Sequence, residues 1–370
     1  VRNFAQAEIA PRAAEVDRSD QFPMDLWRKF GDLGVLGITV SEQYGGADMG
    51  YLAHMVAMEE ISRASASVGL SYGAHSNLCV NQINRNGNEA QKAKYLPKLI
   101  SGEHIGALAM SEPGAGSDVV SMKLRADKKG DRYVLNGTKM WITNGPDCDV
   151  LVVYAKTDLA AGPKGMTAFI LEKGTPGFSV AQKLDKLGMR SSETAQVFLD
   201  NVRVPQRNRI GHEGAGFMMQ MLQFQEERLF GAANMIKGLE QCVDSTIEYC
   251  KERKTFGNAL IDNQVIHFRL AELQTEIESL RALVYQATEL YVKGRDVTKL
   301  ASMAKLKAGR LGREVTDSCL QYWGGMGFMW DNPVSRAYRD TRLVSIGGGA
   351  DEIMLGIICK LMGTLPGKKK

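Results

Sequence analysis

Apolar residues recur every three or four positions through the first hundred residues, which is the spacing of amphipathic helices. Segments 24–38, 53–66 and 88–103 all have this pattern, and a glycine-rich stretch at 44–51 separates the first from the second. Residues 1–17 already look like the middle of such a helix, so we expect the natural chain to begin earlier. This part of the chain is predicted to be helical.

The pattern changes near Ala109, where short runs rich in β-branched and aromatic residues replace the helical spacing. Gly, Pro, Asn or Asp separate these strand-like runs, which are 132–143, 149–157, 165–173, 177–184 and 195–205. From about Gly214 helical spacing returns over two long segments, 217–253 and 263–294.

We therefore predict a mainly α-helical chain with a central β domain, divided into a helical domain 1–108, a β domain 109–213 and a helical bundle 214–370. A β domain between helical blocks offers a cleft at their junction, and such clefts often hold cofactors.

Composition narrows the classes of partner. The formal net charge is +4, and the only dense basic run is Lys368, Lys369 and Lys370, which we interpret as a solvated tail, so no nucleic-acid partner is expected. Six cysteines lie far apart without CxxC spacing, and no His stands at metal spacing, which predicts reduced thiols, an intracellular compartment and no metal site. No apolar run reaches membrane-spanning length, and no targeting segment is visible.

Two segments near the start of the β domain are candidates for ligand binding. The run Ala109–Asp118 holds two glycines, a proline and two serines, and such a loop can present N–H groups and hydroxyls to an oxygen-rich ligand. A plain connecting loop explains it equally well. The run Met140–Gly145 combines Trp, Thr and an Asn-Gly turn, which fits either a hairpin or a stacking surface for a flat cofactor.

Two more candidates lie in the helical bundle. The run Glu252–Gly257 fits the end of a helix, with basic residues on the dipole and Gly257 as the cap. The run Gln321–Phe328 is a glycine-rich aromatic break that packing of a bundle does not require, so we favour a functional role. The chain has no GxGxxG at the start of a βαβ unit and no GxxxxGK[ST] loop, which disfavours two common nucleotide folds.

Together and in this order, the four segments resemble the acyl-CoA dehydrogenase family of flavoproteins, over essentially the whole chain. The resemblance implies a helical N-terminal domain, a β-barrel-like middle domain, a C-terminal four-helix bundle, bound FAD and a homotetramer. The FAD contacts that it implies are Leu108, Met110, Ser111, Gly116, Ser117, Trp141, Ile142 and Thr143, then Arg253, Thr255, Phe256 and Gln264 toward the FAD of a neighbouring subunit, and Gln321, Gly324, Gly325, Ala350 and Glu352.

The reaction implied by the resemblance removes the α-hydrogen of an acyl-CoA as a proton and passes the β-hydrogen as hydride to the flavin. The proton step needs a carboxylate in a water-poor pocket. In many members this base precedes a Gly-Thr/Ser pair, a position that falls on Gly348 here. In the isovaleryl and long-chain types the base precedes an arginine on the first bundle helix, where this chain has Glu226-Glu227-Arg228.

Only one of the two adjacent glutamates can face the flavin, because neighbours on a helix point about 100° apart. Glu227 shares its helix face with Phe224 and Gly231, an apolar and open surface, and it directly precedes Arg228. We therefore predict Glu227 as the catalytic base.

The substrate is predicted from a mixed resemblance. The N-terminal and middle parts resemble isovaleryl-CoA dehydrogenase, and the C-terminal third resembles long-chain and citronellyl-CoA dehydrogenases. Gly231 and Gly348 leave room beside the acyl group, so a 3-methyl-branched acyl-CoA such as isovaleryl-CoA or citronellyl-CoA is expected. The substrate contacts implied are Ser117, Ser192 and Arg228 for the CoA part, with Phe224, Gly231, Gly348 and Gly349 near the acyl part.

The resemblance also implies an electron-transfer flavoprotein as acceptor, and a bacterial cytoplasm or mitochondrial matrix as location. Three alternatives stay open. They are a straight medium- or long-chain acyl-CoA dehydrogenase, an acyl-CoA oxidase, whose chains are usually longer, and a non-catalytic scaffold that binds CoA or FAD.

Overall fold

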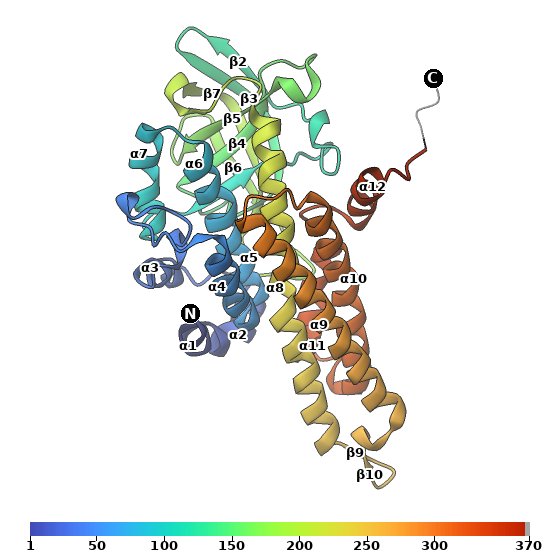
Figure 1. The fold of residues 1–370 in the computed structure, drawn as a ribbon. Coiled ribbons are helices and arrows are strands. Elements are labelled where there is room, and N and C mark those ends of the chain that lie inside the picture. Colours follow the sequence, from blue (N-terminus) through green and yellow to red (C-terminus); the bar gives the residue numbers. More distant parts are fainter. Residues whose placement is uncertain (367–370) are drawn as a thin grey trace.

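The computed structural model describes residues 1–366, apart from the side chains of 181 and 182, so the predicted tail Lys368–Lys370 lies outside the described residues. Figure 1 shows a sheet at one end of the molecule, short helices beside it, and long helices that extend from the sheet to a distant tip. One long helix, α8 (Gly216–Glu252), begins beside the sheet and ends at that tip.

Short helices make up the N-terminal part, with 3-10 and π turns between them. They are α1 (Arg2–Phe4), α2 (Ala13–Ser19), α3 (Asp25–Asp32), α4 (Gly50–Ala64), α5 (Ala66–Gly73), α6 (Asn81–Asn86) and α7 (Glu89–Ile100). The predicted segment 24–38 contains only one α-helix, because Gly34 adopts a left-handed φ of 76° and starts a 3-10 turn. The segment 53–66 is divided at Ser65, whose hydroxyl accepts a hydrogen bond from Val68 N–H and caps α5.

The β domain is one twisted sheet. Its strands are β1 (Gly106–Ala109), β2 (Arg125–Lys129), β3 (Arg132–Thr143), β4 (Val150–Lys156), β5 (Met166–Glu172), β6 (Phe178–Lys183), β7 (Thr194–Pro205) and β8 (Arg209–Ile210). They pair in the order β6-β7-β3-β2-β4-β5-β8, and β1 pairs in parallel with β4. Strand β1 therefore belongs to the sheet although it begins three residues before the boundary expected at Ala109.

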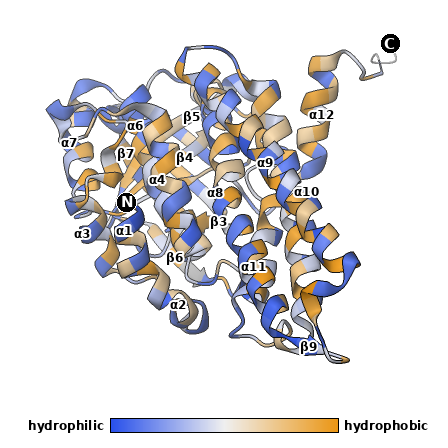
Figure 2. Ribbon diagram, turned by 60° about the horizontal axis from the view of Figure 1, so that its bottom comes forward, coloured by the Kyte–Doolittle hydropathy of each residue, from blue (hydrophilic) through white to orange (hydrophobic). Residues whose placement is uncertain are grey.

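The C-terminal part is a bundle of long helices. It contains α8, a small hairpin of β9 (Lys254–Thr255) and β10 (Asn258–Ala259), α9 (Gln264–Val292), α10 (Thr298–Trp323), α11 (Pro333–Thr341) and α12 (Asp351–Met362). One apolar core joins this bundle to the N-terminal helices. Figure 2 shows that α12 is largely hydrophobic although it projects from the bundle, and Leu355, Leu361 and Met362 on it are exposed.

Helix α8 is fixed in rotation by contacts with the N-terminal helices. A Cβ on Gly73 would lie 1.9 Å from Cζ of Phe230, so a side chain on α5 at that point is excluded and the two helices approach closely. The amide of Gln223 donates to the carbonyls of Asn77 and Leu78 at 3.1 and 2.8 Å. These contacts determine which side of α8 faces the N-terminal domain and which faces away from it.

A buried ion pair ties the first and last parts of the chain together. The guanidinium group of Arg339 on α11 donates to both carboxylate oxygens of Asp17 on α2, at 3.0 and 2.7 Å. The same guanidinium lies 3.7 Å from the ring centre of Trp330. Beside it, burial raises the pKa of the Asp340 carboxyl to about 6, and that carboxyl accepts a hydrogen bond from Met189 N–H in the β domain. The three domains therefore meet at this cluster.

No described helix is long and apolar enough to cross a membrane. Within residues 1–366, no group of His, Cys, Asp and Glu side chains is arranged to hold a metal ion. All six cysteines are free thiols.

Candidate active site

A buried lysine holds the loop Ala109–Asp118 against strand β3. Lys139 has no exposed surface, and its ammonium group donates to the carbonyl of Met110 at 2.7 Å and to the Glu112 carboxylate at 3.0 Å. That carboxylate also accepts hydrogen bonds from the backbone of Lys123 and Leu124. Burial lowers the pKa of Lys139 to about 8, although Glu112 opposes the shift. The loop is therefore anchored on its buried side, and its other side is exposed to solvent.

A β-bulge next to this loop turns Trp141 outward. The register between β3 and β7 shifts between Lys139 and Ile142, and Trp141 has a left-handed φ of 60°, which is rare for a bulky residue. As a result 54% of Trp141 is exposed, while Ile142 is buried and Thr143 is half-buried. A strained aromatic residue kept exposed at a bulge favours a ligand-binding role.

The loop Ala109–Asp118 and the bulge at Trp141 form one surface, called the wall. The other FAD contacts predicted in the β domain lie near it. Leu108 lies on β1, and Met110 is buried directly after it. The carbonyl of Ser111 accepts a hydrogen bond from Met140 N–H at 2.9 Å, which joins the loop to β3. A Cβ on Gly116 would meet nothing within 4 Å, and Ser117 is exposed, so this end of the loop is open.

The two adjacent glutamates on α8 point to different surroundings. Glu226 is buried, forms an ion pair with Arg85 and accepts a hydrogen bond from the Tyr291 hydroxyl at 2.7 Å. Glu227 instead faces the loop 346–350, called the glycine loop, where its Oε1 lies 3.6 Å from the position that a Cβ on Gly348 would take. The sequence argument that only one of them faces the pocket therefore agrees with the geometry.

Burial raises the pKa of the Glu227 carboxyl, and the positive charges of Arg228 and Lys305 oppose this rise. Its one side-chain hydrogen-bond partner within residues 1–366 is Gln220, at 3.5 Å. A poorly solvated carboxylate with few partners and a raised pKa has the properties of a general base.

Of the two glycines expected to leave space, Gly348 does so and Gly231 on α8 does not. Gly348 has a φ of 63°, and no carboxylate occupies its position. Gly231 was expected to leave open space, and that expectation is wrong. The Cδ and Cε atoms of Lys305 lie 3.3 Å from the position of a Cβ on Gly231, so a lysine stem occupies this space.

The remaining predicted substrate contacts differ in their access to solvent. Arg228 is buried beside the Phe224 ring, with its guanidinium carbon 5.3 Å from the ring centre, and donates to the Ser302 hydroxyl at 3.4 Å. Ser192 has no exposed surface. The contact of CoA with Ser192 stays a prediction. Gly349 has a φ of 102°, and its carbonyl accepts a hydrogen bond from Lys305 at 3.0 Å.

Most of the predicted FAD contacts on the bundle lie at the opposite end of the molecule, whereas Ala350 and Glu352 lie at the start of α12. Arg253, Phe256 and Gln264 are exposed around the β9-β10 hairpin, with Thr255 between them, and Figure 1 shows this hairpin at the tip, far from the sheet. Gln321, Gly324 and Gly325 are near the same tip, because Trp323 stacks on Tyr249 with ring centres 4.1 Å apart. Ala350 precedes the first turn of α12, and Glu352 is exposed within that turn.

Two surfaces have residues that fit the FAD implied by the sequence resemblance. One is the loop and bulge around Trp141, and the other is the tip around Phe256 and Gly324. Added Cβ atoms on Gly116, Gly324 and Gly325 would meet nothing within 4 Å, so the backbone there is open to close approach by a diphosphate. Trp141 and Phe256 are exposed aromatic side chains at positive φ, suited to stacking on flat rings.

Sequence reasoning missed Lys139, Glu112 and Lys305. A signal existed for Lys305, which lies between Ala301, Ala304 and Ala308 on an apolar helix face, where a solvated lysine is out of place. For Lys139 the signal was weaker, since a lysine within a strand pattern usually faces solvent.

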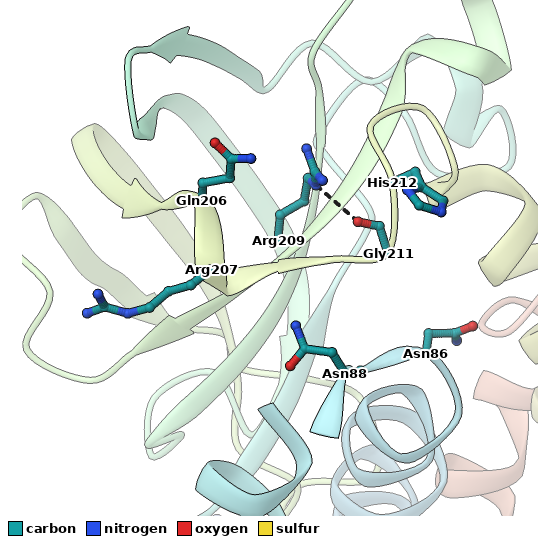
Figure 3. A pocket seen from close by; sticks show the side chains of 8 residues that line it. Asn86, Asn88, Gln206, Arg207, Arg209, Gly211 and His212 are labelled. Atoms are coloured by element: carbon teal, nitrogen blue, oxygen red, sulfur yellow. Dashed lines mark hydrogen bonds between the residues drawn. The ribbon is translucent and has the colours of Figure 1, made fainter. Parts of the chain in front are cut away.

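A surface hollow of about 590 Å³ lies away from these residues, between the N-terminal helices and the end of the sheet. Figure 3 shows that Asn88, Arg209 and His212 line it, together with Arg207, whose side chain points away. The Arg209 guanidinium already bonds to the Gly211 carbonyl and the Tyr133 hydroxyl, so its donors are largely used.

Comparison with known protein families gives one result over the whole chain. Models described as the N-terminal, middle and C-terminal domains of acyl-CoA dehydrogenase match residues 1–103, 107–202 and 214–363. The mitochondrial isovaleryl-CoA dehydrogenase of Pongo abelii is 51% identical over 357 residues, which cover 95% of this chain and 84% of that protein.

Solved structures of other proteins have the same fold as this chain. Butyryl-CoA dehydrogenase from Megasphaera elsdenii has a TM-score of 0.94 at 36% identity and covers 98% of this chain and 95% of its own. An FAD complex of PigA has a TM-score of 0.95 at 30% identity, with the same coverage of 98% and 95%.

Proposed function

The chain belongs to the acyl-CoA dehydrogenase family, and on that premise we propose that it oxidises a 3-methyl-branched acyl-CoA, isovaleryl-CoA first, with Glu227 as the base. It is an oxidoreductase that acts on CH–CH bonds, and FAD is its cofactor. The observation that carries the proposal is the position of Glu227, whose carboxylate faces the side-chain vacancy at Gly348.

The chain's own contribution to the chemistry is the removal and holding of one proton. Bound FAD supplies the acceptor for the hydrogen that leaves the β-carbon as hydride. Glu227 takes the α-proton, and burial favours this because it raises the pKa of the carboxyl toward the working range. The positive charges of Arg228 and Lys305 oppose that rise and favour the carboxylate form.

The cofactor is held by the wall around the bulge. Trp141 and Thr143 on β3, together with Ser111 on the loop, offer a ring surface and hydroxyl groups to the flavin. Lys139 and Glu112 keep this wall in place from beneath, although neither is exposed to a ligand.

A branched acyl chain is the best-supported substrate. The 51% identity to an isovaleryl-CoA dehydrogenase supports it, as does the Lys305 stem that fills the space beside Gly231. Citronellyl-CoA, with its longer chain, needs more room than this arrangement leaves at Gly231. We propose it as a second candidate only because Gly348 still leaves an unfilled position.

A substrate series with two electron acceptors tests this function. We expect kcat/KM for isovaleryl-CoA to exceed that for butyryl-CoA by at least about tenfold, since one buried methyl group is worth about 1–3 kcal/mol. Turnover is expected with an electron-transfer flavoprotein as acceptor and to be slow with O2 alone. A preference for straight octanoyl-CoA would contradict the branched substrate, and equal turnover with O2 would indicate an oxidase. A purified protein without flavin absorbance would favour a scaffold.

We propose that the enzyme is a homotetramer in which FAD lies between two chains. The two sets of FAD contacts are at opposite ends of one chain, because α8 extends about 40 Å from Glu227 to Arg253 at a rise of about 1.5 Å per residue. That is longer than an extended dinucleotide, so a second copy has to bring its tip to the wall. The tip and α12 also expose apolar side chains that a second copy would bury, namely Phe256, Val265, Phe268, Met326, Phe328 and Leu355.

Sedimentation measures the assembly directly. We expect a particle of four times the 40.6 kDa of one chain, with one FAD per chain. The variant Phe256→Asp should dissociate the assembly and release FAD together. A monomer that retains FAD would contradict the shared site.

A further inference from the structure

Lys305 is an almost fully enclosed lysine close to Glu227. It lies on α10, only 2% of it is exposed, and it was not among the residues that the sequence singled out. Burying a lysine costs free energy unless its ammonium group has hydrogen-bond acceptors or a counter-charge. The partners of Lys305 therefore matter.

The stem of Lys305 fills the space beside Gly231 and borders the position that a Cβ on Gly348 would take. Its Cδ and Cε lie 3.3 Å from the Cβ position of Gly231 on α8. Its Cε lies 3.6 Å from the Cβ position of Gly348, and Glu227 Oε1 lies 3.6 Å from that same point. The lysine stem and the carboxylate are therefore at most about 7 Å apart, a separation at which charges interact appreciably in a poorly hydrated pocket.

Backbone carbonyls hold the ammonium group, which forms no ion pair with a carboxylate within residues 1–366. It donates to the carbonyls of Val344 and Gly349, the second at 3.0 Å. Carbonyl dipoles leave its formal charge in place, so the pocket keeps a positive charge opposite Glu227. Burial lowers the pKa of Lys305 to about 8, and Glu227 and Asp351 oppose this shift.

We propose that Lys305 is a positioning and specificity-determining residue. Its stem closes the acyl site at Gly231, and its ammonium group, held by the carbonyls of Val344 and Gly349, stabilises the ionised form of the Glu227 carboxylate. This inference rests on the proposed function, in which Glu227 is the base.

Other charged and titratable groups also interact electrostatically with Glu227 or Lys305. Arg228 is the neighbouring charge on α8, Tyr51 on α4 and Tyr154 on β4 feel the Glu227 charge, and Asp351 on α12 faces Lys305. Arg228 remains in every variant below, so the loss of Lys305 removes one of two cations and not the whole positive field.

Two variants separate the stem from the charge. Lys305→Met keeps a stem of similar length and removes the charge, whereas Lys305→Ala removes both. Binding of non-reactive thioether analogues of acyl-CoA to the FAD-loaded tetramer, measured by calorimetry, reports the pocket without turnover. We expect Lys305→Ala to raise the affinity for long chains relative to isovaleryl by about tenfold or more, and Lys305→Met to leave the ranking unchanged.

The charge is tested by the pH dependence of kcat/KM. The base has to be ionised to react, and removing a nearby cation raises its pKa further. In Lys305→Met the acidic limb should therefore move to higher pH, with about tenfold lower kcat/KM than the parent at the acidic end and recovery at the alkaline end. A purely structural lysine would lower the values at all pH by the same factor.

Gly231→Ala is the matched control, and it decides the question if neither Lys305 variant folds. Its new methyl group would contact the Lys305 stem, so the ranking of chain lengths should stay unchanged. If Gly231→Ala shifts that ranking toward shorter chains, Gly231 lines the acyl pocket itself and the proposal is overturned. Unchanged ranking and pH profile in folded Lys305 variants of an active enzyme would also overturn it. Failure of the parent to oxidise any acyl-CoA would instead refute the proposed function.

Discussion

Replacing Glu227 with glutamine is expected to lower kcat by about 10²–10⁴-fold, the usual range for loss of a general base. Glutamine keeps the size of the side chain but cannot accept the α-proton. Since Glu227 makes only one long side-chain hydrogen bond to the described part of the chain, the variant should fold and retain FAD. Stopped-flow reduction of the flavin by isovaleryl-CoA measures the step directly, and flavin absorbance with calorimetric titration reports loading and substrate binding.

Glu226→Gln is the matched control, because it changes the same residue type one position earlier. Glu226 is paired with Arg85 and Tyr291, so this variant should lose stability while its FAD-loaded fraction turns over within about tenfold of the parent. Retention of rapid flavin reduction in Glu227→Gln, or its loss only in Glu226→Gln, would show that the base has been assigned to the wrong residue.

The second large effect is on stability. Asp17→Asn should destabilise the protein by about 3–5 kcal/mol, because it leaves the buried guanidinium of Arg339 without its compensating charge. The pair is bidentate, with side chains that are only 8% and 5% exposed, and it joins α2 to α11. The midpoint of thermal unfolding, followed by circular dichroism at fixed protein and FAD concentration, measures the loss.

Asp185→Asn provides the comparison at the surface. Asp185 also pairs with an arginine, Arg190, at 2.7 Å, but its side chain is 87% exposed. Exposed pairs contribute about 0–1 kcal/mol, so this variant should unfold at nearly the parent temperature. Similar midpoints for the Asp17 and Asp185 variants would mean that solvent or another group compensates Arg339.

Much of the fold could be predicted from residue patterns alone. The helical spacing before Ala109, the strand-like runs to Pro205 and the long periodic segments after Gly214 correspond to the observed helices, sheet and bundle. Periodicity reports local spacing only. The predicted helix boundaries were therefore wrong where the backbone conformation of a single residue ends a helix. Gly34 and Ser65 each divide a segment that had been expected to be one helix.

The choice between Glu226 and Glu227 could be made from the sequence, whereas the space beside Gly231 could not be predicted from it. Adjacent positions on a helix must diverge, and the sequence neighbours of Glu227 indicated the apolar side. The room at Gly231 could not be judged in the same way. A missing side chain leaves space only if no other element fills it, and the residue that fills it is on α10, more than seventy positions later in the chain.

The sequence by itself therefore determined the order of the domains, the family resemblance with its FAD, and the helix position of the proposed base, because each depends on local spacing and residue type. Only the tertiary structure decided what surrounds that base. Packing of α8, α10 and the glycine loop brought Lys305 across Gly231, buried Ser192 at a domain junction and turned Trp141 outward at a bulge. Such contacts join residues far apart in the chain, and no local pattern encodes which side chain will enter a space that another leaves.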